Sequence, residues 1–150
     1  MHNVLEITNF ICDNIINVIK IIHIFTGRYF MFKMDVEKTK KVFTIIAAGF
    51  FSLQEGMDFI SEYSSKTKEF DPKEFTLIVD GKDVKASAQD VAEQLKNMIM
   101  LYMSVPFKKR IVIQQDSAVA TSQTKRLAKD IPGFDTIIFV NSMEEAITKL

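Results

Sequence analysis

Blocks of apolar residues separated by short polar stretches predict a β-hairpin where the regular part of the chain begins. Residues 29–36 (YFMFKMDV) and 42–48 (VFTIIAA) are rich in aromatic and β-branched side chains, as strands are. The polar residues 37–40 lie between the two runs and form the predicted turn. We therefore expect two neighbouring strands that run in opposite directions.

The next segment carries the pattern of a helix N-terminus. Gly49 breaks the second strand, and Ser52-Leu53-Gln54-Glu55 has the Ser and Glu spacing of a capping box. Helical periodicity then places Leu53, Met57 and Ile60 on one face. The pattern predicts a helix that opens at this box.

The rest of the chain repeats one unit, a helical stretch followed by a short apolar strand. Strands that alternate with helices need crossover connections and hence parallel pairing. The predicted order is β-β-α-β-α-β-α-β-α, an α/β fold with a single, mostly parallel sheet of about five strands and packed helices. The remaining predicted elements are strand 75–79 with a turn at Asp80-Gly81, helix 87–104, strand 111–113, a helix through 127–128, strand 136–140 and a helix from 142 to 150.

Residues 1–28 do not follow this pattern and form an atypical apolar leader before the domain at 29–150. Glu6, Asp13 and Lys20, spaced by seven, give a narrow polar stripe on a broadly apolar helix. Each charge would cost roughly 3 kcal/mol at a bilayer centre, so we do not expect the leader to span a membrane. It is interpreted as an extension outside the functional domain, as a helix that packs on the domain or in a dimer, or as an interfacial anchor.

Composition excludes several classes of function. Nineteen basic and nineteen acidic residues give a net charge of +0, so we expect no nucleic-acid partner. The single cysteine, Cys12, cannot form an intramolecular disulfide, which indicates a reducing, cytoplasmic location. No histidine or cysteine follows His23, and no phosphate-loop or dinucleotide motif is present. We therefore expect no metal, no cofactor and no catalysis by a His- or Cys-dependent mechanism.

Two carboxylates remain as chemical candidates. Asp80 and Asp116 each follow a predicted strand, at the edge where open α/β sheets bind ligands, and would share a cation if the strands are neighbours. The alternative is that Asp80, Asp116 and Asn141 cap turns and helix starts. Ser117, beside Asp116, is a ligand- or partner-binding candidate with them. The basic residues in 108–110 and 125–129 are interpreted as solvated surface or as a contact for phosphate or an acidic partner.

The helix predicted from residue 87 is apolar around its whole circumference near its end. Met100, Leu101 and Met103 point away from the face expected to pack on the sheet. Either another layer covers these side chains, the leader being one candidate, or they form an exposed patch that suits adaptable contact with a partner or a second copy. The face expected on the sheet comprises Ala88, Val91, Leu95, Ile99 and Tyr102.

The element order and three local segments resemble the SpoIIAA-like branch of the STAS family, the fold of anti-anti-sigma factors. The segments are the hairpin leading into Gly49-Phe50-Phe51-Ser52-Leu53, the strand FTLIVD that ends at Asp80, and the closing FVNSMEEAITKL. The resemblance covers about 80% of the chain. It implies a small module that works by binding partners, with related lineages that bind lipids or nucleotides.

The resemblance also draws attention to Ser87. In anti-anti-sigma members, a phosphorylatable Ser lies in an Asp-Ser-Ser-Gly run at the start of the second helix, and Ser87 takes the comparable place. Its flanks here are Lys85-Ala86 and Ala88-Gln89, so the Asp and Gly of that run are missing. The alternative role for Ser87 is a helix N-cap with Asp90 at the third helical position.

The prediction carried forward is a non-enzymatic regulatory or protein-interaction module that binds a protein partner or a second copy. The alternative is a domain that binds a small apolar molecule or lipid in a pocket between the sheet and its helices. A carboxylate-dependent enzyme is the third interpretation. The candidate binding residues are Asp80, Ser87, Met100, Met103, Asp116 and Ser117.

Overall fold

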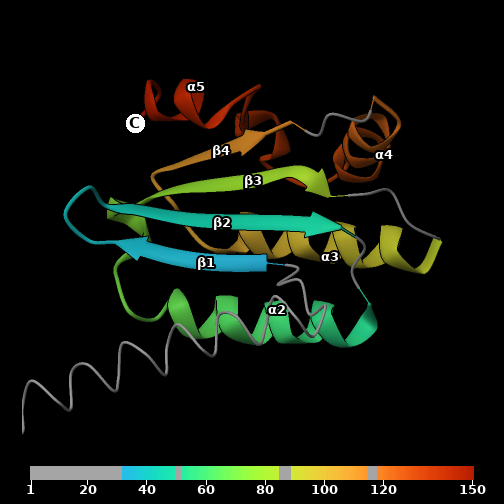
Figure 1. Cartoon of the computed structure of the whole chain (residues 1–150), viewed down its shortest axis with the longest axis horizontal. Coiled ribbons are helices and arrows are strands. Elements are labelled where there is room, and N and C mark those ends of the chain that lie inside the picture. The colour runs from blue at the N-terminus through green and yellow to red at the C-terminus, as the bar shows by residue number, and fades with distance from the viewer. Residues whose placement is uncertain (1–31, 50–51, 85–88, 115–117) are drawn as a thin grey trace, which may run out of the picture. The chain divides into compact units, whose positions relative to one another are not determined.

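The computed structural model describes residues 32–49, 52–84, 89–114 and 118–150 of the 150-residue chain (Figure 1). The described elements all belong to one compact unit, Met31–Leu150. The predicted leader lies outside the described residues, and so do the candidates Ser87, Asp116 and Ser117.

A five-stranded sheet forms the centre of this unit, with the strand order β1-β2-β3-β4-β5. β1 pairs with β2 in antiparallel fashion, and each later neighbouring pair is parallel. The strands are β1 (Phe32–Glu37), β2 (Val42–Gly49), β3 (Thr76–Val84), β4 (Lys109–Ile113) and β5 (Ile138–Val140). The predicted hairpin and the mostly parallel α/β sheet are confirmed.

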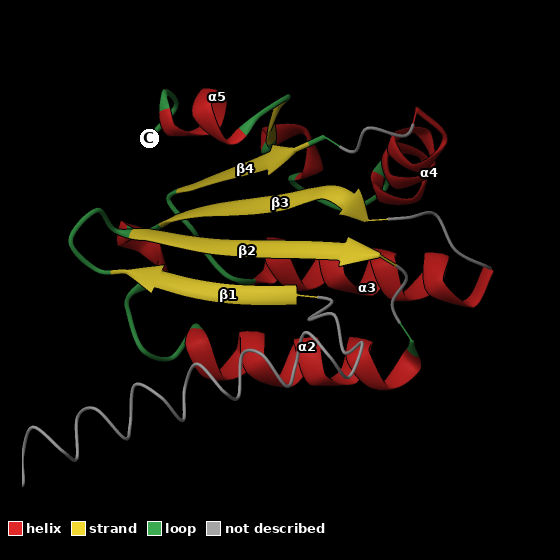
Figure 2. Cartoon of the chain, viewed as in Figure 1, coloured by secondary structure: helices red, strands yellow, loops and turns green. Residues whose placement is uncertain are grey.

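Helices connect the parallel strands or follow the last of them, as Figure 2 shows in red. They are α2 (Leu53–Lys66), α3 (Gln89–Ser104), α4 (Ala118–Ala128) and α5 (Met143–Ile147), with short 3-10 turns at Pro72–Glu74 and Phe134–Thr136. The predicted capping box at the start of α2 is confirmed. Ser52 Oγ accepts a hydrogen bond of 3.2 Å from the Glu55 backbone N–H, and Glu55 Oε2 accepts one of 2.8 Å from the Ser52 backbone N–H.

The predicted turn at Asp80-Gly81 is wrong, because β3 continues to Val84. β2 is long enough to pair with this extension, and its residue Gly49 lies opposite Val84. A register irregularity between Ile46 and Ala48 accommodates the added pairs. The carboxyl end of β3 therefore lies at Val84, four residues after Asp80.

The last strand is shorter than predicted and begins at Ile138. Gly133 has a φ of 81°, a left-handed conformation that glycine adopts without strain. It opens the 3-10 turn Phe134–Thr136, in which Thr136 Oγ1 donates a 2.6 Å hydrogen bond to the Gly133 carbonyl oxygen. This turn includes Thr136, the first residue of the predicted strand 136–140.

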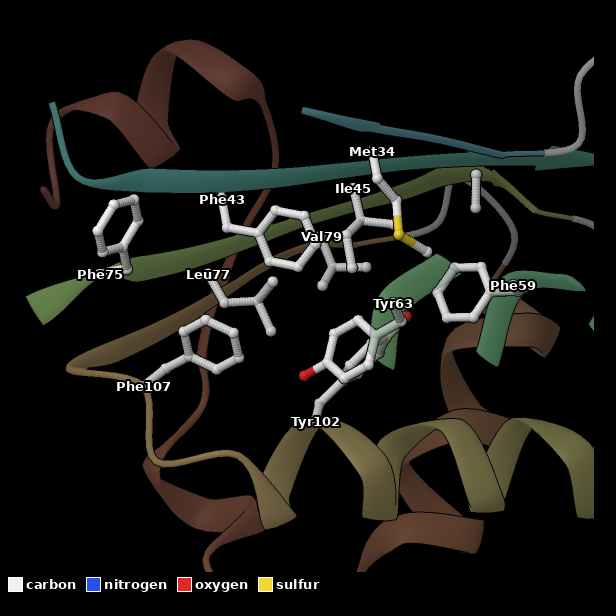
Figure 3. Close-up of a cluster of buried hydrophobic side chains, with 11 residues drawn as sticks. Met34, Phe43, Ile45, Phe59, Tyr63, Phe75, Leu77, Val79, Tyr102 and Phe107 are labelled. Carbon is white, nitrogen blue, oxygen red and sulfur yellow. The ribbon is translucent and has the colours of Figure 1, made fainter. Parts of the chain in front are cut away.

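Side chains that alternate along the strands build a separate apolar cluster on each face of the sheet. On one face, strand residues such as Phe43, Ile45, Leu77 and Val79 pack with Phe59 and Tyr63 of α2 and Tyr102 of α3 (Figure 3). On the other face, Val42, Ile78, Ile111, Ile113 and Val140 pack with Ala146 of α5. The helices α2 and α3 thus cover one face, and α5 covers part of the other.

A third cluster holds α4 against α3. Ile99 of α3 packs with Ala128 of α4 and with Ile131, which follows that helix. The helix α3 therefore contacts α2 on one flank and α4 on the other.

Candidate interaction surface

The described residues around Asp80 give it a local structural role. Asp80 lies in β3 between Ile46 of β2 and Ile113 of β4. Its Oδ1 accepts a 3.1 Å hydrogen bond from the Lys82 backbone N–H. The proposed pairing with Asp116 stays a prediction, because residues 115–117 lie outside the described part. Within the described residues, no group of three or more His, Cys, Asp or Glu side chains could hold a metal ion.

Polar residues after β4 and β5 connect these strands to α5. Asn141 Oδ1 accepts a 3.3 Å hydrogen bond from Gln114 Nε2, and the Asn141 backbone N–H donates to Glu145 Oε2 at 2.9 Å. Ser142 caps the helix by accepting from the Glu145 backbone N–H at 3.1 Å. Hydrogen bonds from its own backbone N–H and from Ser142 lower the pKa of Glu144. The arrangement explains Asn141 as part of a helix start.

Several side chains of the basic cluster make contacts within the domain. Arg110 Nε donates to the Tyr102 carbonyl oxygen at 3.0 Å, and its Nη2 donates to the Val105 carbonyl oxygen at 2.6 Å. The positively charged guanidinium of Arg110 therefore caps the carboxyl end of α3. Lys109 Nζ donates to the carbonyl oxygens of the last two residues, and Lys125 Nζ lies 5.5 Å from the centre of the Phe139 ring. These three positions support the domain itself.

The three off-face residues of α3 have different surroundings. Leu101 is half-buried and packs against the cluster that contains Phe59 and Tyr63. Met103 is also half-buried and packs against the cluster of Ile99, Ala128 and Ile131. Met100 is 50% exposed. Internal layers thus cover two of the three, and Met100 remains on the surface.

A larger apolar surface lies on α2, where Leu53, Met57 and Ile60 are 66%, 57% and 41% exposed. We call these three residues the α2 stripe. The sequence placed them on one face of the helix, and they do share a face. The residues that α2 buries are instead Gly56, Phe59 and Tyr63, about a quarter of a turn away.

The stripe was not among the candidate binding residues, although the sequence contains a sign of it. Phe59 and Tyr63 are aromatic residues at positions i and i+4. Their large rings fill the core better than the smaller side chains of the stripe. Together with the stripe they make α2 apolar over an arc wider than the sheet can cover. The carboxyl-terminal part of α3 has the same excess of apolar surface.

The α2 stripe lies on the flank of α2 that faces α3. Phe59, at the other end of the buried arc, contacts Phe32 of β1 with ring centroids 5.1 Å apart. Tyr63 contacts Tyr102 of α3 at 5.5 Å. The β2–α2–β3 crossover is right-handed. Turning around the axis of α2 from Phe59 past Gly56 to Ile60 therefore leads from the β1 side of the helix to its α3 side. The half-buried Met98 and Leu101 of α3 pack against the core cluster that contains Phe59 and Tyr63.

The carboxylates of α2 lie away from the stripe. The helix carries Glu55, Asp58 and Glu62, against one basic residue, Lys66, whose Nζ lies 3.9 Å from Glu69. Asp58 and Glu62 are exposed, and at 100° per residue Glu62 lies on the face opposite the stripe and Asp58 more than about 100° from its centre. Hydrogen bonds from the Ser52 side chain and backbone lower the pKa of Glu55. The site is therefore an exposed apolar stripe whose solvent-side border, at Gln54 and Ser61, is uncharged.

Comparison with known proteins supports the fold. No family model and no curated protein matches the chain. The solved structures that it resembles include an uncharacterized protein of the DUF3478 family with a SpoIIAA-like fold, from Shewanella loihica PV-4. The two share 14% identity and a TM-score of 0.58, over 79% of this chain and 93% of that one.

A second similar structure is the Bacillus cell fate determinant SpoIIAA in its phosphorylated form. It has 12% identity and a TM-score of 0.51, over 79% of this chain and 97% of its own length. At these identities the likenesses establish the fold alone. The domain is SpoIIAA-like in fold, and the resemblance predicted from the sequence is confirmed at that level. Over the described ranges, no helix has the length and apolar character needed to cross a membrane.

Proposed function

We propose that the protein is a non-enzymatic regulatory module that acts by binding another protein. The observation that carries the proposal is the α2 stripe, where three large apolar side chains lie exposed along one helix. Burying the remaining exposed area of each in a complex would contribute roughly 1–2 kcal/mol. The SpoIIAA-like fold of the domain is consistent with this function. The lone Cys12 supports action in the reducing cytoplasm.

The contents of the core favour this function over binding of a small apolar ligand. Between the sheet and α2 and α3, the space is filled by aromatic side chains that contact one another. Phe43 lies with its ring centroid 5.9 Å from that of Tyr63, 5.5 Å from that of Phe70 and 6.2 Å from that of Phe107. A ligand in this layer would have to displace buried rings, which costs the packing that holds the domain together.

A secondary role in partner binding is proposed for the candidates named from the sequence, which are Met100, Asp80, Ser87, Met103, Asp116 and Ser117. Met100 is an exposed apolar residue of α3, and its flexible thioether side chain would suit contact with a partner there. Ser87 precedes α3 in the chain, and phosphorylation there would add charge near the start of that helix.

Site-specific photo-crosslinking of the full chain in its native cells tests the proposed function. A photo-reactive phenylalanine analogue is placed at Met57 and, as a matched control, at Ile147 of α5, which is 56% exposed. We expect a discrete protein adduct from position 57 that position 147 does not give. The absence of any protein adduct at 57, together with a small molecule retained in native mass spectrometry, would overturn the proposal.

A further inference from the structure

We propose that the domain contacts an anionic phospholipid surface through the end of the sheet at which its parallel strands begin, which we call the amino end. Backbone hydrogen bonds join the turns there. The Thr76 backbone N–H donates to the Lys41 carbonyl oxygen at 2.9 Å, and the Lys108 backbone N–H donates to the Phe75 carbonyl oxygen at 3.0 Å. Figure 1 shows the turn between β1 and β2 and the C-terminus at this same end of the sheet.

The amino end carries more basic than acidic side chains. Its turns and the residues beside them hold nine lysines, which are Lys38, Lys40, Lys41, Lys66, Lys68, Lys73, Lys108, Lys109 and Lys149. They hold five acidic residues, which are Glu37, Glu69, Asp71, Glu74 and Asp135. The chain as a whole has a net charge of +0, so the excess of lysine is local to this end.

Some of these lysines are neutralised within the domain, and others are not. Three are held in ion pairs, which are Lys40 with Glu37, Lys41 with Glu74 and Lys66 with Glu69. Lys38, Lys73 and Lys108 are exposed and form no ion pair within the described part of the chain. We call these three residues the end lysines. Their ammonium groups are available to a ligand outside the domain.

The type of basic residue favours a lipid surface over a folded protein as this ligand. The basic side chains exposed at the amino end are all lysines. Protein interfaces are enriched in arginine, whose planar guanidinium binds a carboxylate through two hydrogen bonds, and they are depleted in lysine. Lysine is a hydrated point charge, and clusters of about four to eight basic residues attract the anionic lipids of a cytoplasmic leaflet.

Two exposed aliphatic side chains lie beside the lysines. Leu150 is 44% exposed, and Lys109 Nζ donates to its carbonyl oxygen at 3.0 Å. Ile147, one helical turn earlier, is 56% exposed. Lysines next to aliphatic residues are typical of surfaces that bind among lipid headgroups, where the charges meet phosphate and the aliphatic groups reach the acyl boundary.

This inference is independent of the proposed function. Contact through the amino end leaves the α2 stripe, which runs along the length of α2, accessible to a protein partner. Vesicle binding and the protein adduct at position 57 are measured separately, so either proposal can fail alone.

The test measures co-sedimentation of the full chain with vesicles of phosphatidylcholine, with and without about 30% phosphatidylserine. We expect at least about tenfold stronger binding to the vesicles that contain phosphatidylserine, with an affinity that falls as salt rises. Equal binding to the two kinds of vesicle, or no binding to the anionic ones at low salt, would overturn the proposal.

Matched variants locate the contact. The end variant combines Lys38→Gln, Lys73→Gln and Lys108→Gln. The control variant combines Lys33→Gln, Lys96→Gln and Arg126→Gln, which remove the same charge from exposed residues of β1, α3 and α4. Each lysine at an anionic surface strengthens binding about fivefold, so the end variant should bind at least about tenfold more weakly. The control should lose less than about threefold, and an equal loss in both variants would overturn the assignment.

Two further measurements test the aliphatic contact and other anionic ligands. Ile147→Gln with Leu150→Gln should weaken vesicle binding several-fold and leave its salt dependence unchanged. A polyglutamate peptide and a DNA duplex serve as competitors. If either one binds the full chain more tightly than the anionic vesicles and requires the end lysines, the amino end belongs to an acidic protein or a nucleic acid, and the proposal is overturned.

Discussion

Tyr63 of α2 and Tyr102 of α3 meet edge to face, with ring centroids 5.5 Å apart and ring planes at 62°. Both side chains are buried, Tyr63 completely. The contact joins α2, which carries the α2 stripe, to α3, so it fixes the relative position of the two helices. Aromatic pairs in this geometry contribute about 0.5–1.5 kcal/mol beyond the burial of their area.

We predict that Tyr63→Phe stabilises the protein. The Tyr63 hydroxyl is buried, and no described group accepts a hydrogen bond from it or donates one to it. Removing an unsatisfied polar group while keeping the ring should raise the free energy of unfolding by about 1 kcal/mol. Urea denaturation measures the change, with Ser61→Ala on the exposed side of the same helix as the control. A loss of stability would show that the hydroxyl is hydrogen-bonded in solution.

We predict a loss of stability above pH 10 that the two tyrosines cause. Burial raises the pKa of both hydroxyls well above their ordinary value of 10.0, although Arg110 opposes this at Tyr63. The unfolded chain releases these protons near pH 10 while the folded chain retains them. The free energy of unfolding should therefore fall by about 1.4 kcal/mol per pH unit for each tyrosine above that pH.

Urea denaturation between about pH 8 and pH 11 measures this slope. The double substitution of Tyr63→Phe and Tyr102→Phe removes both groups and should flatten it. An unchanged slope in the double variant would assign the alkaline loss to lysines instead.

The fold was predictable because its signals are local and repeated. The capping box at Ser52 and the apolar run 75–79 each specify one element, and the alternation of elements specifies parallel pairing. Strand limits were less predictable, since Asp80-Gly81 has the composition of a turn. Whether it turns depends on the partner strand, and the extension of β2 to Gly49 keeps β3 extended.

The candidate surface was harder to predict than the fold. The apolar face Leu53, Met57 and Ile60 is visible in the sequence, but an apolar face is ordinarily the buried one. Here Phe59 and Tyr63 fill the core instead, because the aromatic layer on that side of the sheet needs large side chains. Which of two adjacent apolar faces is buried depends on tertiary packing, which helical periodicity alone does not determine.

We predict that Gly133→Ala destabilises the protein while Gly81→Ala does not. Gly133 has a φ of 81°, and a Cβ there would lie 2.9 Å from Met103 Cε. The left-handed conformation alone should cost about 1–2 kcal/mol with alanine. A Cβ at Gly81 would meet its nearest neighbour, Val84 Cγ2, at an ordinary 3.9 Å. Thermal and urea unfolding of both variants measure the difference, and equal stabilities would show that the turn at Gly133 relaxes.

The final prediction separates Met100 from Met103, which the sequence treated alike. Met100 is 50% exposed, so Met100→Glu should change the free energy of unfolding by no more than about 0.5 kcal/mol. Met103 packs half-buried against Ile99 and Ala128, and a carboxylate there would lose its hydration without gaining a partner. Met103→Glu should therefore cost about 2 kcal/mol or more.

The glutamine variants of both positions separate the effect of charge from that of lost packing. We expect Met103→Gln to fall between the wild type and Met103→Glu, and Met100→Gln to unfold like the wild type. Urea denaturation measures stability, and sedimentation reports any change in association. If Met100→Glu destabilises the protein as much as Met103→Glu, then Met100 is covered in solution. If neither substitution alters stability, the contact between Met103 and the α4 cluster contributes nothing measurable to folding.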